Sequence, residues 1–106
     1  MPKYLLQVSY TADGARGLLK DGGTKRQQAA KALLESLGGT LESFYFAFGD
    51  TDAFAIADLP DAVAAAAGAV ALGASVAAAC TTTVLVTPAE IDQAVKKTVN
   101  YTAPGR

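Results

Sequence analysis

Two strand-like segments flank a single tight turn in the middle of the chain. They cover residues 40–48 and 52–58, and in both the side chains alternate with the period of two that is typical of strands. The turn between them, GDTD at residues 49–52, combines a glycine with aspartates, which favour tight antiparallel connections. The sequence therefore predicts a central β-hairpin, and the fold must contain an antiparallel sheet.

One strand and one helix are predicted before the hairpin. Residues 3–10 alternate as a strand, and a glycine-rich connection with one helical turn around residues 15–20 follows. A helix is expected over residues 25–37, because Thr24 and Gln27 make a capping box, leucines recur at helical spacing and two glycines end the pattern.

Another helix and strand are predicted after the hairpin. Pro60 suits the first turn of a helix that ends near Gly73, and Asp61 suits the positive end of its dipole. Residues 77–86 are the fourth predicted strand. Residues 62–80 carry no charge, but alanine and glycine dominate them, which favours a buried helix and a strand over a membrane span.

A third helix is expected at the sequence TPAE, where Thr87 and Glu90 make another capping box. Residues 98–106 then form a loosely held tail of the single domain that residues 1–106 make up. The apolar side chains of the helix that begins at TPAE are expected to point inward: Ile91, Ala94 and Val95.

The predicted order is β-α-β-β-α-β with an extra C-terminal helix. This order indicates an α+β, ferredoxin-like fold, with two helices on one face of an antiparallel four-stranded sheet. Hydrophobic residues make up 51% of the chain and charged residues only 18%, and no second layer is available for the other face. A second copy of the chain is the simplest cover, so a homodimer or higher oligomer is expected.

Composition excludes several functions. The chain has no histidine, which removes the commonest general base, most zinc sites and the usual ligand of haem; no metal and no cofactor are expected. The net charge of −1 without a basic run argues against nucleic acid. The single cysteine and an N-terminus that reads as a strand, without a signal peptide, fit a cytoplasmic protein.

Five segments resemble the GYD domain family of small bacterial proteins: MPKYLLQVSY, GLLKDGGTKR, LGGTLESFYFAFGDTDAFAIADLPD, TTTVLVTPAEID and AVKKTVNY. The resemblance implies a dimeric α/β barrel, in which two ferredoxin-like sheets pack face to face, and no established activity. The family's Gly-x-Tyr-Asp pattern falls on residues 49–52 with Thr51 in place of tyrosine, so no role of that tyrosine carries over.

The sequence GGTKR is the first candidate ligand site. Free N–H groups at a helix start attract anions, and the helix dipole disfavours the two cations there unless an anionic ligand offsets the cost. Alternatively, both cationic side chains point into water. The residues concerned are Gly22, Gly23, Thr24, Lys25 and Arg26.

The sheet face away from the helices is the second candidate. Gln7, Ser9 and Tyr45 are expected there, among alanines, lining a barrel interior that binds a small ligand. Alternatively, the alanines only let a second sheet approach closely. The alanines meant are Ala53, Ala55 and Ala57, and the side chains expected under the helices are Leu6, Val8, Phe44, Phe46, Phe54, Ile56, Val84 and Val86.

No catalytic residue is assigned. Asp50 and Asp52 are interpreted as turn residues rather than as a carboxylate pair or cation site. Tyr10 and Tyr45 are interpreted as packing residues rather than catalytic acids, and Cys80 as a small hydrophobe. Two functions remain. The first is an oligomeric module that binds a small ligand or serves an assembly or stress-related role. The second is a cofactor-independent monooxygenase or isomerase acting on a small aromatic or lactone-like molecule.

Overall fold

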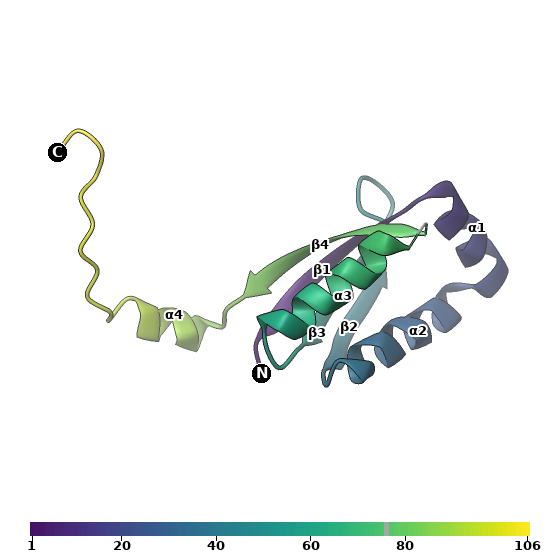
Figure 1. Cartoon of the computed structure of the whole chain (residues 1–106), viewed down its shortest axis with the longest axis horizontal. Coiled ribbons are helices and arrows are strands. Elements are labelled where there is room, and N and C mark those ends of the chain that lie inside the picture. The colour runs from purple at the N-terminus through teal and green to yellow at the C-terminus, as the bar shows by residue number, and fades with distance from the viewer. Residues whose placement is uncertain (76) are drawn as a thin grey trace.

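The fold is a four-stranded antiparallel sheet with helices packed on one face, in a computed structural model that describes residues 1–75 and 77–106 (Figure 1). The strand order is β2-β3-β1-β4, and the ferredoxin-like arrangement predicted from the sequence is confirmed. The elements in chain order are β1 (Lys3–Tyr10), α1 (Ala12–Asp21), α2 (Gly23–Ser36), β2 (Thr40–Phe46), β3 (Ala53–Asp58), α3 (Ala62–Ala74), β4 (Ala78–Leu85) and α4 (Pro88–Ala94).

The connection after β1 contains a full helix, α1, where only one helical turn was predicted. Thr11 caps it, because its Oγ1 accepts a hydrogen bond of 3.2 Å from the N–H of Gly14. A glycine is needed at position 14, since an added Cβ would overlap the carbonyl oxygen of Ala77. Gly14 and Gly17 lower the helix propensity of this segment, and for this reason the sequence predicted only one helical turn there.

Two of the predicted helix starts were wrong. α2 begins at Gly23 after Gly22, whose φ of 79° only glycine adopts readily, and no side chain caps it. The capping box at Thr24 is therefore absent. In α3, Asp61 is the N-cap and accepts a 2.8 Å hydrogen bond from the N–H of Ala64, so Pro60 precedes the helix instead of occupying its first turn.

The alanines of β3 lie under the helices, which corrects the prediction for this strand. Antiparallel pairing places Ala57, Ala55 and Ala53 opposite Tyr4, Leu6 and Val8 of β1, and all three alanines are buried. Because side chains alternate along a strand, Phe54 and Ile56 point to the other face. The core cluster explains the arrangement, since bulky side chains from the other elements fill the space above the alanines: Tyr4, Leu34 and Leu59, with Leu6, Leu37 and Leu41 beside them.

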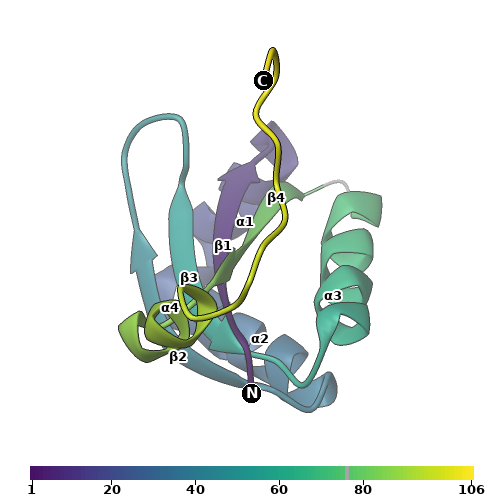
Figure 2. The ribbon, with the colours of Figure 1, turned by 90° about the vertical axis from the view of Figure 1, so that its left-hand side faces the viewer.

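The other strands follow the predicted faces, but three side chains that were expected to pack under the helices are exposed: Phe46, Val84 and Val86. A bulge between Leu41 and Ser43 keeps Leu41 and Phe44 on the helix-covered side of β2. Val84 of β4 shares this side but is largely exposed, and Val86 lies beyond the end of the strand. Figure 2 shows α3 standing to one side of the strands.

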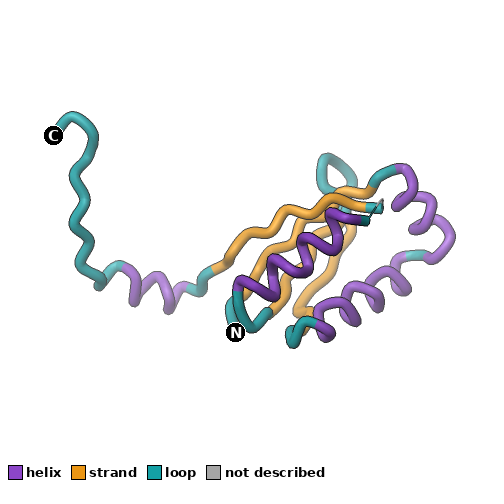
Figure 3. Tube along the Cα trace, viewed as in Figure 1, coloured by secondary structure: helices purple, strands orange, loops and turns teal. Residues whose placement is uncertain are grey.

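α4 extends away from the sheet instead of packing on it (Figures 1 and 3). The predicted capping box is present: Thr87 Oγ1 accepts from the Glu90 N–H at 3.1 Å, and Glu90 Oε1 accepts from the Thr87 N–H at 2.8 Å. The prediction that Ile91, Ala94 and Val95 point inward is wrong. Ile91 and Val95 are 48% and 76% exposed, because no described element lies against this helix.

The uncharged segment over residues 62–80 divides into α3 and the start of β4, as predicted. None of the helices in the described part of the chain combines the length and the apolar character that crossing a membrane requires.

Candidate functional site

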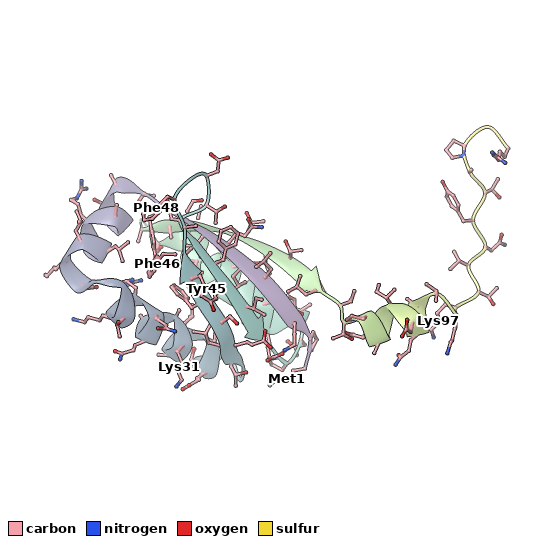
Figure 4. The ribbon with its side chains drawn as sticks, turned by 180° about the vertical axis from the view of Figure 1, so that it is seen from behind. Met1, Lys31, Tyr45, Phe46, Phe48 and Lys97 are labelled. Atoms are coloured by element: carbon pink, nitrogen blue, oxygen red, sulfur yellow. The ribbon has the colours of Figure 1, made fainter. Side chains whose placement is uncertain are left out.

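The face of the sheet opposite the helices is called the open face here, and Figure 4 looks onto it. A row of four directly paired residues crosses all four strands on this face: Tyr45 of β2, Phe54 of β3, Gln7 of β1 and Thr81 of β4. Ser9 lies on the same face, two residues beyond Gln7. The structure therefore brings Gln7, Ser9 and Tyr45 to one surface, with the unpredicted Phe54 between Gln7 and Tyr45.

The loop between β2 and β3 contacts one end of the open face. Ser9 Oγ donates a 3.0 Å hydrogen bond to the carbonyl oxygen of Asp50, and Thr51 Oγ1 donates a 3.4 Å hydrogen bond to Gln7 Oε1. Thr51, which replaces the tyrosine of the Gly-x-Tyr-Asp pattern, thus touches a predicted site residue. Both Gln7 and Ser9 hold the loop in place in the single chain.

The opposite end of the open face carries a small ionic cluster. Lys3 Nζ lies 2.6 Å from Glu42 Oε1 and 3.0 Å from Asp58 Oδ1. Hydrogen bonds to Glu42 and then Asp58 raise the pKa of Lys3 above its usual value. Between this cluster and the loop lie the half-buried apolar side chains of Leu5, Phe54 and Ile56.

Asp52 fastens the hairpin turn to β1. Its Oδ2 accepts a 2.7 Å hydrogen bond from the N–H of Tyr10, and its own N–H donates to the carbonyl oxygen of Val8 at 2.9 Å. Asp50 is exposed at the tip. The described residues contain no group of three or more His, Cys, Asp or Glu that could hold a metal ion. The geometry gives the Asp52 carboxylate a structural role in the turn, whereas Asp50 contributes its backbone carbonyl.

The segment from Gly22 to Arg26 forms the corner between α1 and α2. Lys25 Nζ lies 3.9 Å from Asp21 Oδ1, and Arg26 Nη1 lies 3.8 Å from Asp21 Oδ2. Asp21, which the sequence-based argument did not weigh, therefore offsets part of the cost of placing two cations beside a helix N-terminus. Thr24 is exposed on the first turn, and Gly23 packs near the ring of Phe46.

A cavity of about 250 Å³ lies on the other side of the sheet, between α2, α3 and the strands. Most of its lining is apolar, and Arg26 is the charged residue among the described residues that line it. The sequence-based argument missed this cavity. The available signal was the run of small residues on the facing helices, of which Ala29 and Ala30 of α2 line the cavity.

Cys80 lies on the helix-covered face, opposite Val8. Burial raises the pKa of its thiol, and a hydrogen bond with Thr82 opposes this only in part. A thiol that stays protonated suits the predicted role of a small hydrophobe better than that of a nucleophile.

Comparison with known proteins agrees with the resemblance seen in the sequence. Among curated proteins and among solved structures, nothing matched the chain. The GYD domain matches residues 4–95. This range includes every helix and every strand, apart from the first residue of β1. The chain therefore belongs to the GYD domain family.

Proposed function

We propose that this protein is a homo-oligomeric binding module, in which the open faces of two copies pack together and enclose a site for a small ligand. One observation carries the proposal. No described element of the same chain covers the open face (Figure 4), and on this face Leu5, Phe54 and Ile56 form an apolar strip. Large apolar side chains grouped on one exposed face are typical of a contact surface.

The layout of the open face suits a two-fold contact. Its middle is apolar, and its two ends carry the Lys3 ionic cluster and the hydrogen-bonded loop at Asp50 and Thr51. An apolar centre with polar margins is the usual anatomy of a protein interface. A two-fold axis through the middle would bring the apolar strip of one copy onto that of the other.

The C-terminal arm, defined as residues 87–106, supports the same conclusion. It leaves the sheet at the end of β4 and extends from the rest of the molecule (Figure 3). A partner chain is the natural cover for its exposed apolar side chains: Ile91, Val95, Val99 and Tyr101.

The enclosed surface offers polar groups for a small ligand. Gln7, Tyr45 and Thr81 contribute an amide and two hydroxyls along one row, with the ring of Phe54 among them. Such a mixture of apolar surface and a few polar groups is typical of a small-molecule site. The charged groups of this face, Lys3 with Glu42 and Asp58, pair with one another at one end of it, so the row itself offers groups suited to binding.

Light scattering after size-exclusion chromatography, together with native mass spectrometry, tests the proposal. The wild type should be a dimer or larger, with retained non-covalent mass where a ligand co-purifies. Ile56→Lys puts a charge in the apolar strip and should give a folded monomer. Leu19→Glu is the matched control, because Leu19 is 87% exposed on α1, and it should leave the oligomer intact. A monomeric wild type at micromolar concentration would contradict the proposal.

A further inference from the structure

The helix-side cavity has a polar end and an apolar end. Tyr10 is the last residue of β1 and pairs with Ala78, the first residue of β4. Ser75, which caps the end of α3, is only three residues before Ala78 and therefore lies at the same end of the cavity as Tyr10. The start of α2 lies at the same end, because Gly23 packs near Phe46, which pairs with Ala53 opposite Val8. All three polar side chains that line the cavity therefore gather at this end: Tyr10, Arg26 and Ser75.

The other end of the cavity is apolar. α2 runs from this polar end toward the core, where Leu34 packs with Tyr4. Leu6, Leu33 and Leu72 line the cavity on the way, together with alanines whose small side chains leave the space unfilled. An apolar space of this kind binds apolar groups readily.

Arg26 is the charged residue that lines the polar end, in the part of the chain that the structure describes. Its guanidinium shares the single carboxylate of Asp21 with Lys25, at 3.8 Å and 3.9 Å, so two cations face one anion. Only Arg26 of these three residues lines the cavity. The planar guanidinium presents paired N–H donors that match the two oxygens of a carboxylate.

We propose that this cavity binds a small amphipathic monocarboxylate, with its apolar part between α2 and α3 and its carboxylate at Arg26. An apolar cavity of roughly 150 Å³ holds benzene, so about 250 Å³ accommodates on the order of ten non-hydrogen atoms, such as an aromatic ring with a short acid chain. The site lies on the opposite face of the sheet from the proposed contact between copies, and it does not depend on that contact.

A ¹H–¹⁵N NMR titration of the full-length chain tests this site, with 3-phenylpropionate as the probe and 3-phenylpropan-1-ol as its uncharged counterpart. Shift changes should concentrate at Ala29, Ala30, Leu72 and Ala78. The acid should bind about tenfold more tightly than the alcohol, because only the acid can pair with the guanidinium. Equal affinity for the two compounds, or no concentrated shifts up to millimolar probe, would overturn the proposal.

Three variants separate the contribution of the Arg26 charge to binding from the contribution of the cavity volume. Arg26→Gln should weaken binding of the acid about tenfold and leave the alcohol unchanged. Lys25→Gln is the matched control, since Lys25 shares Asp21 but does not line the cavity, and its effect should stay under about twofold. Ala30→Phe should fill the cavity and remove binding of both compounds, with the unfolding temperature as a check on its fold. Equal losses in the Lys25 and Arg26 variants would contradict a carboxylate site.

The oligomeric state is measured separately, so failure of the cavity site and failure of the proposed contact between copies can be told apart. If the arm of a second copy occupies the cavity, neither compound will produce shifts there, while light scattering will still report an oligomer. A monomer that binds the acid would support the cavity site and contradict the proposed contact through the open face.

Discussion

Tyr4 and Ala57 lie directly opposite each other in the β1–β3 pair, and both are almost completely buried, at 4% and 0% exposure. A bulky ring on one strand is matched by a single methyl on the next. The same relation holds for Leu6 with Ala55 and for Val8 with Ala53. β1 and the helices therefore supply most of the bulk of the core, and β3 supplies a low surface on which that bulk rests.

Enlarging Ala57 should destabilise the fold. Ala57→Val adds two methyl groups beneath Tyr4 in a site without free space, and overpacking of this kind costs about 1–3 kcal/mol. Ala67→Val is the matched control, because Ala67 is exposed on α3, and it should change stability by less than about 1 kcal/mol, the difference in helix propensity. Urea unfolding followed by circular dichroism measures both, and equal effects would show that the alanine row is not tightly packed.

The two glycines inside α1 should respond in opposite directions to substitution by alanine. Gly14→Ala would drive a Cβ into the backbone of Ala77 and should cost about 2 kcal/mol or more. Gly17→Ala meets no atom within 4 Å and should stabilise the protein by about 0.5–1 kcal/mol, since alanine favours the helix. Thermal unfolding of both variants checks the sign, and a stabilised Gly14→Ala would contradict the close contact between α1 and residue 77.

Much of the fold follows from local patterns. The alternation in residues 3–10 and 40–48 and the capping box at Thr87 each have a local physical cause. The structure contains both strands, although β2 ends at Phe46, and it contains the capping box. α1 was missed because Gly14 serves a contact with Ala77, more than sixty positions away in the sequence, and its local effect is to disfavour a helix. A prediction from local sequence alone cannot tell a glycine that is required by a distant contact from a glycine that ends a helix.

Residue size could not predict which side chains of β3 point toward the helices. Phe54 and Ile56 are larger than the alanines between them, and a prediction based on hydrophobicity places them inside. The strand register determines instead which side chains of β3 lie under the helices. Ala57 pairs with the buried Tyr4, and the helix side chains need the room above it. The helix-side cavity escaped prediction for a related reason: it depends on how far α2 and α3 stand apart, which no single segment specifies.

Asp52 should matter for stability, and Asp50 should not. Asp52→Ala removes the acceptor of the 2.7 Å hydrogen bond from the Tyr10 N–H, and an unmade bond of this kind costs about 1–3 kcal/mol. Asp50→Ala keeps the carbonyl oxygen that accepts from Ser9 and should fall within about 0.5 kcal/mol of wild type. Urea unfolding compares the two, and a larger loss for Asp50→Ala would assign the acidic turn a different role.

The helicity of α4 should depend on pH through Glu90. The Thr87 N–H donates to the Glu90 carboxylate, which lowers the pKa of this group below its usual value of 4.5. Because the pKa is lower in the folded state, the ionised carboxylate stabilises the helix above pH 4.5, and this contribution is lost as pH falls through the lower, folded-state pKa. A helix of seven residues, all of them exposed, is marginal in water, so its population should respond strongly.

Cα chemical shifts of residues 88–94, followed from pH 7 to pH 3, measure this loss directly. Glu90→Gln should remove the acid-induced change, because an amide cannot titrate. Asp92→Asn keeps both hydrogen bonds of the capping box and should retain the change. If α4 keeps its helicity at pH 3 in the wild type, then a partner rather than its capping box holds the helix, and the C-terminal arm is already covered in solution.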